Sequence, residues 1–353
     1  MLKAMFRKNL LDCTLQELEV VVRELGEPAY RGRQLASWIF QRNVFDLDLM
    51  SDLPKSFRSR LRDETGIDAP RVDQVVTSSD GSRKLILKLS DGNRVHAVLM
   101  PDEGRLTLCL STQVGCGFAC AFCFTGTMGL VRNLTAGEIV AQFLVARNEC
   151  SPEARMTHLV FMGMGEPLAN YDATVKALRI LTDPHACGFS PRRITVSTVG
   201  IVKGIDRLAK ESLHVNLAVS LHATTDEQRN RLMPVNRGNP IGDLLAACRR
   251  FQLPVRRRIF FEYVLLDGVN DSIEDARRLV QLLRGIRAKV NLIPFNEWPG
   301  ARFSRPPLPR VLAFQKILLD GGLIATIRWS KGEDIGAACG QLQEPRLAEK
   351  VLA

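Results

Sequence analysis

The spacing of apolar and polar positions changes along the chain. From about residue 105 onward, short apolar runs alternate with longer amphipathic stretches. Short apolar runs bounded by turn residues are typical of strands buried on both faces, and amphipathic stretches are typical of helices. The candidate strands are 106–112, 157–162, 193–198, 214–220, 257–265, 289–294 and 323–329.

Helix signals fall between these strands. Thr135 and Glu138 form a capping-box pattern that opens one helix, and Asp271–Leu283 is a second helical stretch. Regular alternation of strands and helices implies a parallel sheet covered by helices, and about six such units make a partial barrel. Chemistry in such a sheet belongs at the C-terminal ends of the strands.

The first 65 residues have a helical period instead. Thr14 and Glu17 form a capping box for a helix that stops at Gly26, Tyr30–Arg42 predicts a second helix, and Pro54 opens a third. Basic residues surround the second and third helices: Arg31, Arg33, Arg42, Lys55, Arg58, Arg60 and Arg62. Such a small basic module suits either a nucleic-acid surface or an ordinary solvated face.

Residues 72–76, 84–89 and 94–99 read as strands separated by Asp80-Gly81 and Asp91-Gly92. Asp-Gly between strands is a strong hairpin signal, so this stretch predicts an antiparallel patch.

We therefore divide the chain into four parts. A helical module covers 1–65, an antiparallel extension 66–104, the partial barrel 105–332, and a C-terminal segment 333–353.

Composition and charge bear on the partners of the protein and on its cellular compartment. The 353 residues are 46% hydrophobic, carry a formal charge of +10 and have a sequence pI of 9.3. A basic protein is suited to a polyanion such as RNA, although a merely basic enzyme would have the same charge. No signal peptide or membrane-spanning run is expected, and the nine cysteines have no secreted-scaffold spacing. We expect reduced thiols in a cytoplasmic protein.

Cys116, Cys120 and Cys123 form a C-x3-C-x2-C run with Phe122 before the last cysteine. Soft thiolates bind zinc or iron–sulfur clusters, and a closed zinc site needs four ligands. No fourth Cys or His lies nearby in sequence, although a remote one could complete a zinc site. A [4Fe-4S] cluster with three protein ligands leaves one iron free to chelate the amino and carboxylate groups of S-adenosylmethionine. The run resembles the signature of radical S-adenosylmethionine (radical SAM) enzymes.

Polar residues end successive candidate strands. Gly165 and Glu166 follow the second strand, and the glycine would let the backbone approach a ligand while Glu166 accepts hydrogen bonds from an ammonium group. The later strands end on Ser197, Ser220-Leu221-His222 and Asn296. Together these residues predict a lined pocket on the face that holds the cysteine run.

Two further cysteines are candidates for chemistry. Cys339 is surrounded by small residues, which leave a thiol open to reaction, although a buried structural cysteine would look the same. Cys109 lies on the first barrel strand, seven residues before Cys116. The remaining cysteines have no supporting context: Cys13, Cys150, Cys187 and Cys248.

The ordered motifs resemble the RlmN/Cfr family of RNA methyltransferases. They are Leu108-Cys109, Ser111 to Cys116, Gly163-Met164-Gly165-Glu166-Pro167-Leu168, Ser220-Leu221-His222, Ile293 to Asn296 and Ala337 to Leu342. The resemblance extends to Gly26-Glu27-Pro28 and Arg31 to Gln34, and so covers almost the whole chain. It implies an α/β fold: a partial (β/α)6 radical SAM barrel with a small N-terminal helical module and a short antiparallel β patch.

The resemblance also implies a reaction. The RlmN type methylates carbon 2 of an adenine in 23S rRNA and, in many members, of an adenine beside a tRNA anticodon. It uses one [4Fe-4S] cluster per chain, held here by the three clustered cysteines, and two SAM molecules per turnover. The first SAM methylates the cysteine matched by Cys339, and the second yields a radical that activates this S-methyl group for addition to adenine. A second cysteine, matched by Cys109, then frees the RNA by forming a transient disulfide.

The family pattern also assigns the SAM contacts and a base. The SAM contacts match Gly165, Glu166, Ser197, Ser220, Leu221, His222 and Asn296. Where the commonest pattern has a Glu as proton acceptor, this chain has His96, which can also serve as a base near neutral pH.

Two other readings stay open: a Cfr-like C8 methyltransferase, and an iron–sulfur RNA-binding protein without catalysis. For an RlmN-type C2 methyltransferase we expect 23S rRNA, before full ribosome assembly, and tRNA as partners. We also expect an electron donor such as flavodoxin or ferredoxin, no membrane, and a monomer.

Overall fold

The sheet of the computed structural model is continuous across ten strands within the residues that it describes, 7–151, 154–254 and 256–343. Its order is β14-β13-β12-β11-β10-β9-β6-β5-β4-β3. The parallel part comprises β6 (Arg105–Cys109), β9 (His158–Phe161), β10 (Ile194–Thr198), β11 (Asn216–Ser220), β12 (Ile259–Leu265), β13 (Ala288–Pro294) and β14 (Ile324–Ile327). Each predicted barrel strand is confirmed, and neighbouring members pair in parallel.

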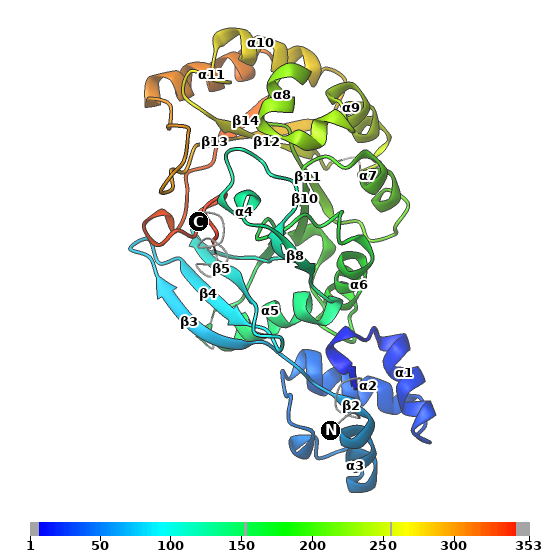
Figure 1. Cartoon of the computed structure of the whole chain (residues 1–353). Coiled ribbons are helices and arrows are strands. Elements are labelled where there is room, and N and C mark those ends of the chain that lie inside the picture. The colour runs from blue at the N-terminus through cyan, green and yellow to red at the C-terminus, as the bar shows by residue number, and fades with distance from the viewer. Residues whose placement is uncertain (1–6, 152–153, 255, 344–353) are drawn as a thin grey trace.

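Helices connect these parallel strands. They are α5 (Ala136–Asn148), α6 (Tyr171–Thr182), α7 (Val202–Leu208), α8 (Asp226–Leu232), α9 (Ile241–Arg250), α10 (Ile273–Leu282) and α11 (Leu308–Asp320). Figure 1 shows α6, α7, α9, α10 and α11 along the outer side of the sheet. The capping box of Thr135 and Glu138 and the predicted helix at 271–283 are both present. The fold is therefore the expected partial radical SAM barrel.

The antiparallel patch continues the barrel sheet. It consists of β3 (Arg71–Thr77), β4 (Arg83–Lys88) and β5 (Arg94–Asp102), and β5 pairs antiparallel with β6. Val98 stands opposite Cys109 in this pairing. The patch thus places its residues directly beside the first barrel strand.

The N-terminal module contains α1 (Leu15–Glu24), α2 (Tyr30–Ala36) and α3 (Lys55–Glu64), with the short parallel pair β1 (Lys8–Asn9) and β2 (Thr65–Gly66). The capping box of Thr14 is formed as expected. The predicted second helix differs, because α2 ends at Ala36 and continues as a π-helical turn, Ser37–Gln41. Figure 1 shows the module at one end of the molecule, next to α5 and α6.

Contacts to α5 and α6 fix the module to the barrel. The Gly137 backbone N–H at the start of α5 donates to the Asp12 carboxylate at 2.6 Å, and Lys176 pairs with Glu17 at 2.7 Å. A side chain at Gly137 would lie 2.8 Å from the Asp12 nitrogen, so glycine is required for this close approach. One hydrophobic core therefore runs from Leu10 to Leu342.

A second small hairpin encloses the cysteine run, and the sequence pattern did not predict it. β7 (Gln113–Cys116) pairs antiparallel with β8 (Gly129–Asn133), and α4 (Phe124–Thr127) lies between them. Gly115 has φ +75°, and a Cβ there would come within 2.0 Å of the Gly129 carbonyl oxygen. Within the described residues, no helix is both long and apolar enough to span a bilayer.

Candidate functional site

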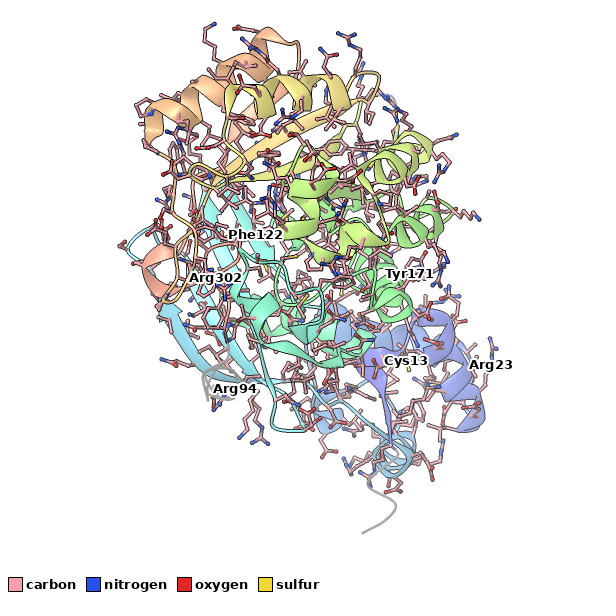
Figure 2. All side chains as sticks on the ribbon, turned by 45° about the horizontal axis from the view of Figure 1, so that its top comes forward. Cys13, Arg23, Arg94, Phe122, Tyr171 and Arg302 are labelled. Carbon is pink, nitrogen blue, oxygen red and sulfur yellow. The ribbon has the colours of Figure 1, made fainter. Side chains whose placement is uncertain are left out.

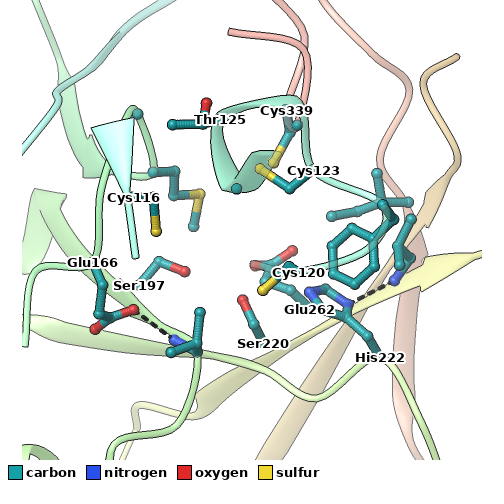
Figure 3. Close-up of a pocket in the computed structure, with 18 of the residues that line it drawn as sticks. Cys116, Cys120, Cys123, Thr125, Glu166, Ser197, Ser220, His222, Glu262 and Cys339 are labelled. Carbon is teal, nitrogen blue, oxygen red and sulfur yellow. Dashed lines mark hydrogen bonds between the residues drawn. The ribbon is translucent and has the colours of Figure 1, made fainter. Parts of the chain in front are cut away.

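A cavity of about 1050 Å³, including open space at its mouth, lies at the C-terminal ends of the barrel strands. This volume is at the upper end for small-molecule sites. Figure 3 shows thiols, carboxylates and hydroxyls directed into it from the cluster loop (residues 116–123), the strand ends and the C-terminal segment. Its lining includes most of the predicted site residues: Cys116, Cys120, Cys123, Gly165, Glu166, Ser197, Ser220, His222, Asn296 and Cys339.

The three clustered thiols lie around the cavity (Figure 3). Cys116 ends β7, whereas Cys120 and Cys123 follow in the loop before α4. Burial raises the pKa of all three thiols, that of Cys123 to about 11. The neighbouring thiols of Cys123 and Cys116 raise the pKa of Cys120 further. A bound cation stabilises the thiolate form of a coordinating cysteine, so this donor set suits a thiolate-ligated group.

The described residues contain no group of three or more His, Cys, Asp or Glu side chains arranged to hold a metal ion. The three thiols nevertheless lie near one another, because Cys116 and Cys123 both influence Cys120 electrostatically. Cys13 lies elsewhere, in the N-terminal module, as Figure 2 shows. Cys150, Cys187 and Cys248 do not line the cavity either.

Gly165 and Glu166 have more specific roles than the sequence suggested. Gly165 has φ +97°, and a Cβ there would lie 2.5 Å from the Cβ of Gln113, so the glycine lets its loop pack on β7. The buried Glu166 carboxylate accepts backbone N–H bonds from Leu168 (2.9 Å) and Val199 (2.8 Å). Burial raises its pKa to about 7 despite these bonds. The carboxylate lines the cavity, where it can accept further donors.

The residues ending β10 and β11 divide into two groups. Ser197, Ser220 and His222 line the cavity, whereas Leu221 is fully buried and is absent from the lining. His222 has φ +55°, and its Nδ1 accepts the Val264 backbone N–H at 2.9 Å. Burial lowers the pKa of His222 to about 3, so the ring is neutral.

Asn296 holds the segment that carries Cys339. Its amide Nδ2 donates to the Cys339 carbonyl oxygen at 3.0 Å. The Phe124 backbone N–H donates to the Gly340 carbonyl at 2.8 Å, and the Thr125 hydroxyl donates to the Leu342 carbonyl at 2.6 Å. The C-terminal segment is therefore bonded both to a strand end and to the cluster loop.

A clasp between residues 78–84 and 332–336 fixes the same segment from the other side. The Gly332 backbone N–H donates to Asp80 at 2.9 Å, and the Ser79 backbone N–H donates to Asp334 at 3.0 Å. Lys84 donates to the Ile335 carbonyl. The turn of the β3–β4 hairpin thus positions the chain just before Cys339.

Cys339 and Cys109 differ in access. Cys339 is exposed and lines the cavity, yet the surrounding protein raises its pKa to about 11. Cys109 is buried behind the lining on β6, and burial, together with nearby Cys339, raises its pKa to about 12. Both are free thiols, so the predicted disulfide is not formed in this structure.

His96 lies on β5, next to the first barrel strand, and is 1% exposed. Its backbone carbonyl accepts a hydrogen bond from the Ser111 hydroxyl at 2.7 Å. The side chain does not line the cavity.

Sequence reasoning missed three charged residues of the site. Glu262 and Arg328 line the cavity from β12 and from the chain after β14. Arg229 is fully buried on α8 and donates to five acceptors: the carbonyls of Leu221, Val199, Ser220 and Asn239 and the side chain of Asn236. Each is one polar position in an otherwise ordinary strand or helix, so no local motif marks it.

The basic residues of the N-terminal module are partly engaged with its own acidic groups. Arg31 and Arg33 lie 3.7 and 3.6 Å from Glu27 and Glu19, while Arg42 stacks on Trp38 at 4.1 Å. A second basic run, Arg256 to Arg258, lies just before the N-terminal end of β12, away from the end that meets the cavity.

Two family models match the chain. The radical SAM superfamily model matches residues 110–280, and the model of the ribosomal RNA large subunit methyltransferase N-terminal domain matches residues 8–67. The first match contains the cluster loop, and the second coincides with the helical module.

Similar proteins cover almost the whole chain. A protein of Syntrophobacter fumaroxidans named dual-specificity RNA methyltransferase RlmN is 50% identical over 94% of this chain and 96% of its own length. One of the same name from Halorhodospira halophila is 51% identical over 95% of this chain and 93% of its own. A crystal structure of a radical SAM methyltransferase from Sphaerobacter thermophilus superposes with a TM-score of 0.91 at 48% identity, covering 95% and 99% of the two chains.

Proposed function

This chain belongs to the RlmN family of radical SAM RNA methyltransferases, and we propose that it methylates carbon 2 of an adenine in 23S rRNA and of an adenine beside a tRNA anticodon. The observation that carries the proposal is the meeting of Cys339 with the three clustered thiols around one cavity.

Cys339 is proposed to carry the methyl group as S-methylcysteine. Carbon 2 of adenine lies between two ring nitrogens and is not a nucleophile, whereas a thiolate can take a methyl group from SAM by displacement. Hydrogen bonds donated by the Asn296 side chain and by the Phe124 backbone N–H hold the loop with Cys339 facing the cavity. Both the SAM and the incoming base could then reach the sulfur.

Cys109 is proposed to resolve the covalent intermediate. Its thiolate would attack the sulfur of Cys339, so that a disulfide forms as the methylated adenine leaves. The electrostatic influence of Cys339 on Cys109 supports their proximity. Because Cys109 is buried behind the lining, the loop of Cys339 would need to move for this attack.

Cys116, Cys120 and Cys123 would hold a [4Fe-4S] cluster, which supplies the electron that cleaves SAM when bound. Glu166, Ser197, Ser220, His222 and Asn296 offer hydrogen-bonding groups for SAM, with the backbone around Gly165 and Leu221. Of these, Leu221 could contribute only through its backbone, because its side chain is fully buried.

The role of His96 as proton acceptor stays a prediction, because the side chain is buried outside the cavity lining. If His96 is the base, His96→Ala should accumulate a covalent RNA–protein adduct after methylene addition. Normal methylation by this variant would contradict the role.

RNA binding is proposed for the N-terminal module through Arg31, Arg33 and Arg42. Neutralising all three should weaken binding of an rRNA fragment and reduce its salt dependence, while SAM cleavage is retained. Unchanged affinity would move the RNA surface elsewhere. We further propose a cytoplasmic monomer that receives electrons from a flavodoxin or ferredoxin.

The decisive experiment is mass spectrometry of nucleosides from rRNA and tRNA incubated anaerobically with reconstituted protein, SAM and dithionite. We expect 2-methyladenosine in both RNAs. Formation of 8-methyladenosine would favour the Cfr-like alternative, and SAM binding without any methylated product would favour a protein without catalysis.

A further inference from the structure

A row of polar side chains runs across three neighbouring strands and ends at the cavity, which Glu262 alone of the three residues lines. Strand register places Glu262 of β12 beside Asn291 of β13, and Asn291 beside Thr326 of β14. The Thr326 hydroxyl donates to Asn291 Oδ1 at 2.9 Å, and Asn291 Nδ2 donates to Glu262 Oε1 at 2.8 Å. The row therefore fixes the orientation of the Glu262 carboxylate before any ligand binds.

The second carboxylate oxygen of Glu262 is available. Glu262 is 3% exposed and lines the cavity, and its Oε2 is buried with no hydrogen-bond partner. Buried polar atoms in folded proteins nearly always have a partner, and a missing one marks a position that a ligand can complete. Burial raises the pKa of Glu262, while nearby Arg328 opposes that rise.

Arg328 supplies donors to the same floor. It follows β14 two residues after Thr326, so both side chains belong to the same face of the strand path. The Arg328 backbone N–H donates to the Leu292 carbonyl at 2.8 Å, and its Nη1 lies 3.4 Å from the weak acceptor Met162 Sδ. Although both residues line the cavity, no ion pair within 4.0 Å joins Arg328 to Glu262 among the described side chains.

The Glu262 carboxylate is a hydrogen-bond acceptor, and the Arg328 guanidinium, which lines the same cavity, is a donor. Such a pair suits a planar ligand that has an amino group beside a ring nitrogen. Adenine has this edge: N6 donates and N1 accepts. Guanine and hypoxanthine have the opposite pattern, with O6 accepting and N1 donating. Enzymes that modify a base in RNA or DNA bind it in a pocket and read this edge by hydrogen bonds.

We propose that Glu262 accepts a hydrogen bond from the N6 amino group of the target adenine while Arg328 donates to N1. This inference rests on the proposed function and assigns base selectivity to two residues outside the motifs of the sequence analysis. The adenine of SAM has the same edge. Both residues influence Cys339 electrostatically, and this favours the RNA base, because its carbon 2 must bond to the methyl carbon on this sulfur, whereas SAM brings its methyl group and not its adenine ring to it.

The test compares two RNA probes in equilibrium binding by fluorescence anisotropy, with anaerobically reconstituted protein. One probe is a 23S rRNA fragment with the target adenine, and the other has hypoxanthine at that position. Wild type should bind the adenine probe about 10- to 100-fold more tightly, as expected for hydrogen bonds to charged groups. Glu262→Gln should bring the ratio close to one, because an amide can donate to O6 as well as accept from N6.

The matched control is Glu211→Gln, which changes a carboxylate paired with Arg179 at 2.6 Å away from the cavity and should keep the wild-type ratio. A second variant, Arg328→Met, should bind adenine and 1-deazaadenine probes equally, whereas wild type should prefer adenine. This arm keeps the proposal testable if Glu262→Gln fails to fold.

Equilibrium binding of labelled SAM separates the two sources of adenine. SAM affinity should be unchanged in Glu262→Gln. A large loss of SAM affinity with an unchanged RNA ratio would overturn the proposal and assign the pair to the cofactor. Wild-type discrimination that survives in both variants would also overturn it, whereas a wild-type protein without affinity for either probe would refute the proposed function itself.

Discussion

The wall and the floor of the cavity are built in different ways. The wall consists of loops: the cluster loop, the turn at Gly163 to Glu166 and the C-terminal segment with Cys339. The floor consists of strand positions that each contribute one side chain, such as Ser220 and Glu262, and Asn291 supports Glu262 from the next strand. The wall holds the clustered cysteines and Cys339, and the floor holds fixed charges and hydrogen-bonding groups, whereas Cys109 lies behind the lining on β6.

This difference separates reactivity from selectivity. Loop residues can approach one another from different parts of the chain and can move, as the proposed exchange between Cys339 and Cys109 requires. Strand residues are held by backbone pairing and cross-strand bonds, so they can present a rigid pattern to a ligand. Changes in the wall should therefore abolish chemistry, while changes in the floor should alter stability or binding.

The largest effect is expected in the cluster loop. Replacing Cys116, Cys120 or Cys123 by Ala should remove the cluster and all methylation, because two protein thiolates are too few to retain the cluster. Iron and sulfide content and the brown absorbance measure the loss. Cys248→Ala, a buried thiol on α9, is the control and should keep the cluster. A triple-Ala protein that assembles a four-iron cluster would refute the ligand assignment.

Replacing Cys339 and replacing Cys109 should stop the reaction at different steps. Cys339→Ala should form no methylated RNA, since it has no sulfur to carry the methyl group. Cys109→Ala should still add the methylene group to adenine but cannot release it, so RNA should remain covalently attached to Cys339. Denaturing gels with nuclease treatment and peptide mass spectrometry detect the adduct. Normal turnover by Cys109→Ala, or an adduct on another cysteine, would contradict this scheme.

A large effect on stability is expected beneath the floor. Arg229→Met should leave several buried carbonyl groups without donors, at a cost of about 3–5 kcal/mol in the free energy of unfolding. Urea denaturation measures the change, and SAM affinity should also fall because Val199 and Ser220 lose their support. Arg237→Met, an exposed arginine nearby, should change stability by less than about 0.5 kcal/mol. Equal stability of the two variants would show that the hydrogen bonds of Arg229 are replaceable.

The same contrast explains what the sequence could predict. The barrel strands and the cysteine run could be identified because periodicity and short contiguous motifs are local properties of the chain. Glu262 and Arg328 could not, because their proximity depends on register across β12, β13 and β14. The family pattern predicts Leu221 as a SAM contact, and since its side chain packs in the core, this stays a prediction for its backbone only. The pairing of β5 with β6 was also not predicted, although the two strands are separated only by Glu103-Gly104.

The smallest effect concerns the clasp that supports the wall. Burial opposes ionisation of Asp80, but hydrogen bonds from the Gly332 and Ser82 backbone N–H groups outweigh it and lower the pKa to about 2. A carboxylate whose pKa is lower in the folded state stabilises it fully above the unfolded value, about 3.9, and loses this contribution as pH falls toward 2. Because Asp80 is exposed, Asp80→Asn should cost no more than about 1 kcal/mol at neutral pH.

Hydrogen exchange and urea denaturation test the clasp together. At pH 7 the Gly332 amide should exchange up to about fivefold faster in Asp80→Asn, since that is the ratio for 1 kcal/mol of local stability. The stability difference from wild type should shrink as pH falls from 5 to 2, because Asp80 then becomes protonated. Asp102→Asn, which removes only an ion pair with Lys331 at 3.5 Å, should leave Gly332 exchange unchanged. If both variants had the same effect, the general loss of negative charge would be responsible, and the wall would not depend on the Asp80–Gly332 bond.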